Sequence, residues 1–222
     1  MSAPTYPQRQ FALPADATEV VLVRHGASQA HVAGEPFELI EGGHADPPLA
    51  PEGRAQAERV GARLAAEAPG AVFVTSLQRT AQTAAPLLAA TGLTATVVPE
   101  LREVHLGDWE GGELRVRLAH RDPLIVQLFD QERWSVIPGA EAPEAFASRT
   151  RAGLDAVVAA AAPGGSVVAV VHGGVIGELC RQATGSRPFA FIHADNASIT
   201  RLVAFADGRL GLRCFNDTSH LT

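Results

Sequence analysis

Two kinds of apolar pattern alternate along the chain: short runs of β-branched residues, and stretches in which apolar positions recur every three to four residues. The runs are typical of buried strands, and the recurring pattern is typical of amphipathic helices. Strands are predicted at residues 19–23, 71–75, 94–98 and 166–171, with a hairpin at 198–205 and 210–215 that turns at Asp207–Gly208. Helices are predicted at residues 51–68, 76–92, 115–134, 143–162 and 175–184.

The order of these elements predicts the fold class. Alternating strands and helices indicate parallel strands joined by helical connections, so we expect an α/β fold. The expected architecture is a three-layer sandwich, with a mostly parallel central sheet and helices on both faces. Glycine-rich segments at 33–51 and 101–112 are predicted as loops, and Ser76 is expected to cap the helix that follows it. Residues 1–18, which hold three prolines, are predicted as an extended arm, and 19–222 as a single domain.

Composition narrows the possible partners. With 46% hydrophobic and 19% charged residues, the 222-residue chain can bury a substantial core. Its net charge of −6 argues against nucleic acid or an anionic membrane surface as the main partner. No apolar run approaches the ~20 residues that span a bilayer. Two cysteines are too few for a disulfide framework, and no secretory signal is recognisable, so we expect a cytoplasmic location.

Two of the predicted strands end in the same way, one at Arg24-His25-Gly26 and the other at His172-Gly173-Gly174. Ligands of open α/β sheets bind beyond the carboxyl ends of the strands, so both histidines are expected at the functional edge. Arg79, in the first turn of a predicted helix, opposes the helix dipole. A cation in that position favours an anion-binding site, although a solvated surface arginine is the alternative. No metal-ligand spacing is present, so neither a metal nor another cofactor is expected.

Six motifs in order carry a resemblance to a known family. They are Val-Arg-His-Gly (23–26), Asp-Pro-Pro-Leu-Ala-Pro-Glu-Gly (46–53), Ser-Leu-Gln-Arg-Thr-Ala-Gln-Thr (76–83), Leu-Arg-Glu-Val-His-Leu-Gly-Asp-Trp-Glu-Gly (101–111), Val-His-Gly-Gly (171–174) and Asn-Ala-Ser-Ile-Thr (196–200). Together they cover roughly residues 19 to 204, and the chain resembles the histidine phosphatase superfamily, also called phosphoglycerate mutase-like.

This resemblance implies a role for each core residue. His25 matches the nucleophile, which attacks phosphorus and becomes a phosphohistidine. Arg24, Arg79 and His172 match the residues that hold the phosphoryl group, whose negative charge their donors stabilise without a metal. Glu103 matches the acid that protonates the leaving oxygen, a role for which nearby Glu110 would be the alternative.

Gly173, Ser28 and His31 complete the expected substrate-binding set. His31 stands where many family members have an asparagine that touches phosphate, so it is expected either to replace that ligand or to swing out of the pocket. Ala27 replaces the usual glutamate of the family. The segment 32–45 is acidic and longer than the usual connection, which weakens the case for a substrate with a second phosphate.

The expected function is hydrolysis of a small-molecule phosphate ester through a phosphohistidine. A cofactor-dependent phosphoglycerate mutase is the first alternative, because it shares the first chemical step. Mutases of the family carry a substantial insertion between the acid and the second histidine, whereas Glu103 and His172 are only 69 residues apart here. A non-catalytic phosphate-ligand binding protein is the second alternative, which the presence of all the core residues disfavours.

Overall fold

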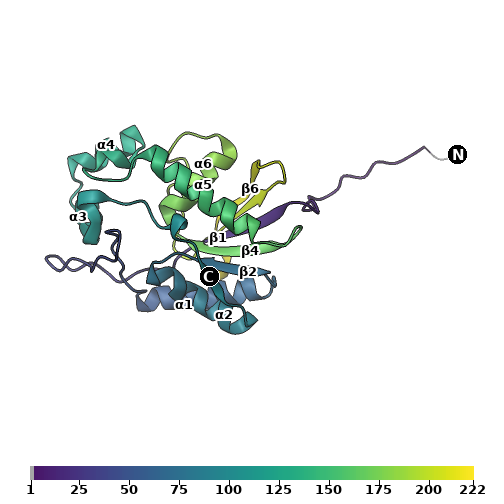
Figure 1. Cartoon of the computed structure of the whole chain (residues 1–222), viewed down its shortest axis with the longest axis horizontal. Helices are drawn as coiled ribbons and strands as arrows, with labels where there is room; N and C mark the ends of the chain where they lie inside the picture. Colours follow the sequence, from purple (N-terminus) through teal and green to yellow (C-terminus); the bar gives the residue numbers. More distant parts are fainter. Residues whose placement is uncertain (1–2) are drawn as a thin grey trace.

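The computed structural model describes residues 3–222, so residues 1–2 of the predicted arm lie outside the described residues. Residues 3–14 form neither helix nor strand. The beginning of this arm extends away from the rest of the molecule (Figure 1), whereas Phe11 contacts Arg213 of β6 (Leu210–Asp217). No helix within residues 3–222 is both long enough and apolar enough to cross a membrane.

The centre of the molecule is a six-stranded sheet in the order β3-β2-β4-β1-β5-β6. Its strands are β1 (Thr18–Arg24), β2 (Ala71–Val74), β3 (Ala95–Val97), β4 (Ser166–Val171), β5 (Ile199–Ala204) and β6 (Leu210–Asp217). The pairs β2–β3, β2–β4 and β1–β4 are parallel, whereas β1–β5 and β5–β6 are antiparallel. The predicted mostly parallel sheet and the C-terminal hairpin are therefore confirmed.

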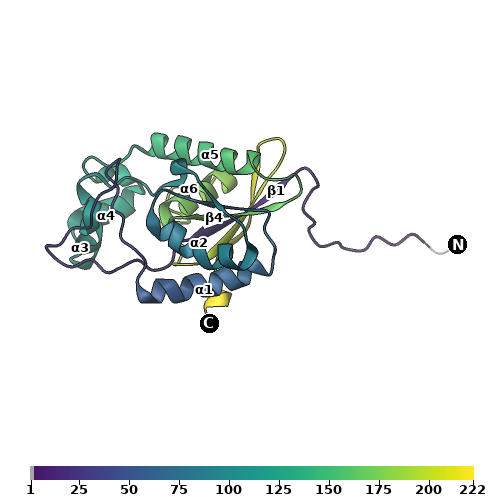
Figure 2. The ribbon, with the colours of Figure 1, turned by 60° about the horizontal axis from the view of Figure 1, so that its bottom comes forward.

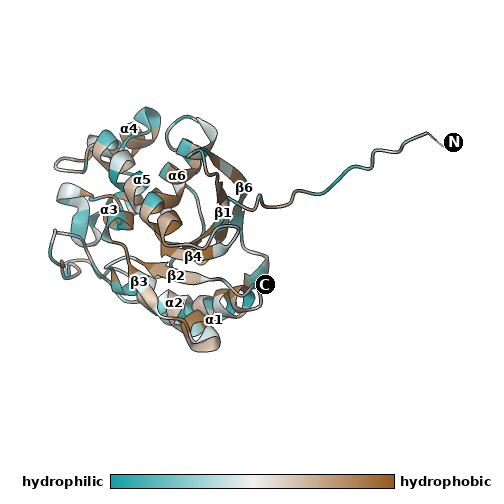
Figure 3. Ribbon diagram, turned by 45° about the vertical axis from the view of Figure 1, so that its right-hand side comes forward, coloured by the Kyte–Doolittle hydropathy of each residue, from teal (hydrophilic) through white to brown (hydrophobic). Residues whose placement is uncertain are grey.

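Alternation of side chains along each strand builds a core on both faces of the sheet. Val20 and Leu22 of β1 share one core cluster with apolar residues of α5 (Pro143–Ala159) and α6 (Gly173–Thr184). Val21 and Val23 share the other cluster with residues of α1 (Pro51–Ala65) and α2 (Gln78–Thr91). Figure 2 shows α5 and α1 on opposite sides of the sheet, and in Figure 3 apolar colour gathers on the strands between them. The predicted three-layer sandwich is confirmed.

The single helix predicted at 115–134 is wrong. The chain instead forms α3 (Glu113–Ala119) and α4 (Pro123–Gln131), followed by a short 3₁₀ turn at Trp134–Val136. Pro123 lacks an N–H and disfavours a helical residue before it, and the Asp122 side chain caps the new helix by accepting the Leu124 N–H over 2.8 Å. These two helices lie at one end of the molecule (Figure 1), where they pack on a separate small core.

Candidate active site

The ends of β1 and β4 bring the two histidines together. The strands are adjacent and parallel, with Arg24 opposite Val171, so the residues that follow them emerge at the same edge of the sheet. The rings of His25 and His172 have their centroids 5.2 Å apart at an interplanar angle of 61°. His172 is fully buried and His25 is 7% exposed. The structure thus joins in one site the two residues that the strand ends predicted.

The neighbours of His25 define which ring nitrogen carries the proton. Nδ1 lies 2.7 Å from the carbonyl oxygen of Gly26, which can only accept, so Nδ1 is the donor. Nε of Arg79 donates to Nε2 of His25 over 3.3 Å, so Nε2 offers its lone pair. Burial, followed by the charges of Arg79 and Arg24, holds the pKa of His25 well below its usual value of 6.5. The result is a neutral imidazole with a nucleophilic nitrogen beside a cation.

The backbone around His25 is held from three other segments. A Cβ on Gly26 would lie 2.4 Å from the carbonyl oxygen of Gly53, so only glycine permits the close approach of α1 to this loop. The Gly26 amide donates to Oγ1 of Thr83 in α2 over 3.0 Å. Asn196, just before β5, donates to the carbonyl oxygen of His25 over 2.9 Å. These contacts fix the position of the imidazole.

Arg79 reaches the site from the first turn of α2, but the predicted cap of that helix is wrong. Helix α2 begins at Gln78 without a side-chain cap from its preceding residue, and Ser76 does not fill that role. Oδ1 of Asp46 accepts the Gln78 N–H over 2.9 Å instead. The same carboxylate lies 3.7 Å from Nη1 of Arg79, which also donates to the carbonyl oxygen of Ala45 over 3.0 Å. An anion from a distant loop satisfies both the helix end and the arginine.

Two buried nitrogens of the site, Nε of Arg24 and Nδ1 of His172, have no hydrogen-bond partner within the described residues. The other ring nitrogen of His172 pairs with Oγ1 of Thr75 over 3.0 Å, and Nη1 of Arg24 donates to the carbonyl oxygen of Ala194. Gly173 leaves room beside Arg24, because a Cβ there would lie 3.4 Å from the unpaired Nε. Buried polar groups almost always have partners, so these unpaired groups point to a ligand with acceptor atoms.

Glu103 is held opposite the second histidine. Its Oε1 accepts the Val104 N–H over 2.9 Å, and its Oε2 accepts the N–H of Gly174, in the first turn of α6, over 3.1 Å. Burial lowers the pKa of Arg24 and of Arg79, and the negative charge of Glu103 opposes that shift in both. The carboxylate of Glu103 therefore lies within electrostatic reach of both arginines, next to the histidine pair.

Glu110 serves a different purpose. Its two oxygens accept the backbone N–H groups of Ala45 over 2.8 Å and of Leu106 over 3.0 Å. Ala45 in turn accepts a hydrogen bond from Arg79. The contacts of Glu110 join the loop that contains Ala45 to the segment that carries Glu103. Glu103 itself accepts a hydrogen bond from the N-terminal turn of α6, directly after the second histidine.

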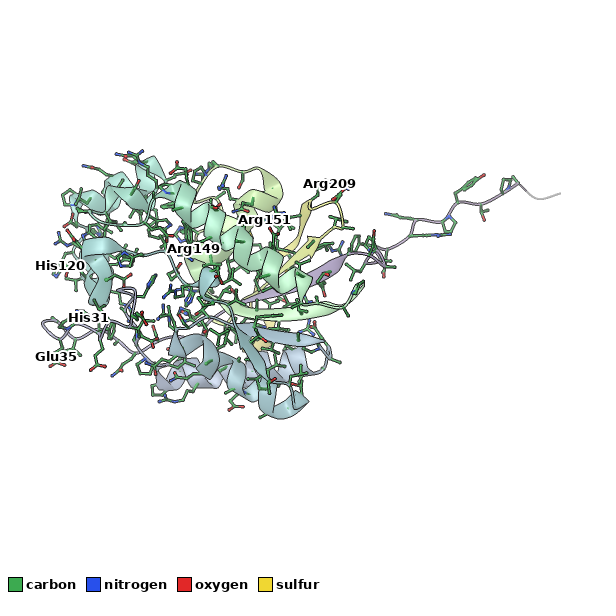
Figure 4. All side chains as sticks on the ribbon, viewed as in Figure 1. His31, Glu35, His120, Arg149, Arg151 and Arg209 are labelled. Carbon is green, nitrogen blue, oxygen red and sulfur yellow. The ribbon has the colours of Figure 1, made fainter. Side chains whose placement is uncertain are left out.

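The predicted substrate ligands Ser28 and His31 are not joined to the cluster. The ring of His31 packs edge-on against Phe37 at 5.4 Å (His31 is labelled in Figure 4), and its Nδ1 is unpaired among the described residues. The hydroxyl of Ser28 accepts a hydrogen bond of 2.7 Å from Nη2 of Arg115. Within residues 3–222, no contact joins His31 to the two histidines or the two arginines.

Arg115 is the site residue that the sequence did not reveal. It projects from α3, lies 5.2 Å over the ring of Phe37, and donates to the carbonyl oxygen of Gln29 over 2.6 Å. Its positive charge adds to the depression of the pKa of His25. Nothing in the sequence pattern singled it out, because the single helix predicted across 115–134 gave no reason for Arg115 to face the histidines.

Two hollows lie near Glu103, and Glu103 itself lines the smaller one. One, of about 110 Å³, is lined among others by His44, Arg79, Glu103, Trp109 and Arg115. The other, of about 400 Å³, begins at Gly174 and is lined among others by Trp134, Phe146, Phe189 and Ile192. Trp109 is 3% exposed and belongs to the core beneath α4. Within residues 3–222, no group of three His, Cys, Asp or Glu side chains is arranged to hold a metal ion.

Comparison with known families gives an independent view of the chain. A family model for the histidine phosphatase superfamily (branch 1) matches residues 20–218. A bifunctional protein of Mycobacterium tuberculosis is 31% identical over 92% of this chain, which spans only 55% of the length of that relative. Phosphoglycerate mutase-like protein 4 of Arabidopsis thaliana is 32% identical over 93% of this chain and 88% of its own.

Solved structures share the fold. The mycobacterial glucosyl-3-phosphoglycerate phosphatase is 28% identical, with a TM-score of 0.72 over 91% of this chain and 100% of its own. A phosphoglycerate mutase from Bacillus anthracis superposes with a TM-score of 0.75 over 93% of this chain and 96% of its own. At 24% identity, that second likeness concerns the fold alone.

Proposed function

Because this chain belongs to the histidine phosphatase superfamily, we propose that it is a metal-independent phosphomonoesterase that forms a phosphohistidine on His25. Phosphatases stand among its structural neighbours. The carrying observation is a neutral imidazole, whose unprotonated Nε2 accepts a hydrogen bond from Arg79, beside two buried nitrogens that have no hydrogen-bond partner within the described residues. A phosphoryl group would supply acceptor oxygens to the unpartnered nitrogens while its phosphorus meets the lone pair.

In the first step, the lone pair of His25 Nε2 attacks phosphorus. The bond from phosphorus to the ester oxygen breaks, and its electron pair goes to the departing oxygen, which takes a proton from the carboxyl group of Glu103. Arg24, Arg79 and His172 hold the other phosphoryl oxygens. Their donors are already in place before the reaction, so they stabilise the transferring charge with little reorganisation.

In the second step, water releases the phosphate. Glu103, now a carboxylate, takes a proton from a water molecule as the water oxygen attacks phosphorus. The bond between phosphorus and His25 Nε2 breaks, its electron pair returns to the ring, and inorganic phosphate leaves. Glu103 is thereby protonated again for the next cycle.

Thr75 sets the tautomer of His172 in this scheme. Its Oγ1 accepts the Leu77 N–H over 3.3 Å and lies 3.0 Å from Nε2 of His172. If the hydroxyl proton points to Nε2, the proton of the ring is on Nδ1, which is the unpartnered nitrogen. His172 then donates to the phosphoryl group without carrying a charge, consistent with burial holding its pKa well below 6.5.

A phosphoglycerate mutase is the second candidate, since the Arabidopsis relative and other curated relatives carry mutase names. Between Glu103 and His172, however, the chain has only two short α-helices before α5, of seven and nine residues. The resemblance implies a substantial insertion in this stretch for mutases, so the short connection supports the phosphatase.

The test is phosphate release from a panel of monoesters in EDTA, run beside a phosphoglycerate mutase assay. The panel should range from small polyol phosphates to aromatic phosphates, because the hollow that Glu103 lines and the hollow that begins at Gly174 differ in size and lining. His25→Ala should abolish turnover and the acid-labile phosphoenzyme, whereas His120→Ala, at an exposed position (Figure 4), should behave as wild type. Full activity of folded His25→Ala would overturn the assignment, and mutase turnover with little phosphate release would favour the second candidate.

A further inference from the structure

Arg149 of α5 uses every N–H of its guanidinium group. Nε and Nη2 donate to the two carboxylate oxygens of Glu141, each over 2.7 Å. Nη1 donates to the carbonyl oxygens of Glu100 and Arg102, both over 2.7 Å, and Nη2 donates to that of Glu103 over 2.8 Å. Five donors in a rigid plane thus grip three backbone carbonyls and one carboxylate, which no other side chain type can reproduce.

The segment that Arg149 grips has little other regular support. Residues 102–106 form neither helix nor strand, although they carry the carboxylate of Glu103. Glu141 extends the grip, because its backbone N–H donates to the carbonyl oxygen of His105 over 2.9 Å and its Oε2 accepts the His105 N–H over 3.3 Å. His44 adds a second contact to the carbonyl oxygen of Glu103, at 3.1 Å.

The surface of α5 is shaped to hold this segment closely. At Gly153, one turn after Arg149, a Cβ would lie 2.8 Å from the side chain of Leu101. Leu101 is itself buried in the core that α5 shares with the sheet. Helix α5 therefore holds the chain at and just before Glu103 in two ways. Gly153 packs on Leu101, and Arg149 supplies the hydrogen bonds.

We propose that Arg149 is a positioning residue for the proton donor: it fixes the backbone of Glu103 so that the carboxylate meets the leaving oxygen. This inference rests on the proposed function, in which Glu103 protonates that oxygen. A displacement of about 1 Å at a reacting group costs on the order of 10²-fold in rate. Arg149 makes no contact with the histidines, so its loss should leave phosphoryl transfer to His25 intact when the leaving group needs no proton.

The experiment compares Arg149→Lys with Arg151→Lys in the full-length chain. Arg151 lies two residues further along α5 (Figure 4) and forms an ion pair of 2.8 Å with Asp155 on the helix surface, so it is a matched control. Each variant is assayed for kcat and KM on an alkyl phosphate and on 4-nitrophenyl phosphate, whose leaving group departs without a proton. For Arg149→Lys we expect about a 10- to 10²-fold loss of kcat/KM on the alkyl ester and less than a threefold loss of kcat/KM on the aryl ester. The ratio kcat/KM reports transfer to His25 and not the later release of phosphate, which both esters share.

The outcomes separate this inference from the proposed function. Equal losses on both esters, or wild-type activity on both, would overturn the positioning role. If Arg149→Lys does not fold, Glu141→Gln, which keeps the size of the side chain and removes one acceptor, decides by the same comparison. Glu103→Gln is the reference variant. If it loses the same activity on both esters, the proton-donor assignment itself is wrong. If Glu103→Gln loses more activity on the alkyl ester but Arg149→Lys does not, only the role of Arg149 is refuted.

Discussion

Replacing Gly174 with alanine should displace the carboxylate of Glu103 and leave the fold in place. The new Cβ would lie 2.4 Å from Oε1 of Glu103, well inside the 3.4 Å at which ordinary contact begins. The carboxylate is the free end of a side chain, so it yields by about 1 Å, which costs on the order of 10²-fold in rate, or about 2.7 kcal/mol. Alanine is also a better helix former than glycine, so α6 is not weakened.

The assay for this change is kcat/KM on an alkyl phosphate, with 4-nitrophenyl phosphate as the reference ester and thermal unfolding as the measure of folding. We expect the loss on the alkyl ester to exceed the loss on the aryl ester by at least tenfold. Gly70→Ala is the matched control, because its Cβ would meet nothing closer than the carbonyl oxygen of Ser166 at 3.6 Å. A folded Gly174→Ala that hydrolyses the alkyl ester within threefold of the wild-type rate would refute the reasoning.

Three further predictions follow from the same site. Burial holds the pKa values of His25 and His172 well below 6.5, so as the pH falls below 6.5 protons bind the unfolded chain first. The free energy of unfolding should therefore fall by about 1.4 kcal/mol per pH unit for each histidine. Urea titrations of His172→Gln at several pH values should show a shallower decline than those of the wild type. Arg115 lines the smaller of the two hollows, so Arg115→Gln should weaken substrate binding and raise KM severalfold at nearly constant kcat. A selective loss of kcat would contradict a role of Arg115 in substrate binding. Asp46→Ala should lower the free energy of unfolding by about 1 kcal/mol by uncapping α2 at Gln78, and an unchanged urea midpoint would argue against the cap.

The sequence predicted the strand ends of the site because a single local rule governs them. A β-branched run marks a buried strand, and the residues after it must lie at the carboxyl edge of the sheet. That reasoning places His25 and His172 at the same edge of the sheet. Their contact also requires β1 and β4 to be neighbours, which the structure shows. The motif resemblance added Glu103, and in the structure its carboxylate bonds to the N-terminal turn of α6.

The contacts that hold the site depend on folding at long range. The cap of α2 joins Asp46 to Gln78 across 32 positions, and Arg149 meets Glu103 across 46. No periodicity encodes such pairs, because each depends on where a loop and a helix surface meet. The same limit applies to Arg115, whose two hydrogen bonds to the loop after β1 span 86 and 87 positions.

Strand β1, which ends just before His25, is the first of the sheet to be synthesised, yet its neighbours β4 and β5 are among the last. Val20 pairs with Val167 on one side and with Leu202 on the other. At a synthesis rate of about 5–20 residues per second, β1 leaves the ribosome roughly 10–40 seconds before both partners exist. During that interval the apolar run of β1 cannot pair with β4 or β5, and the rest of the nascent chain or a chaperone must shield it from solvent. A chain cut short before β5 therefore lacks one border of the strand that precedes the proposed nucleophile, so we expect premature termination to yield inactive fragments.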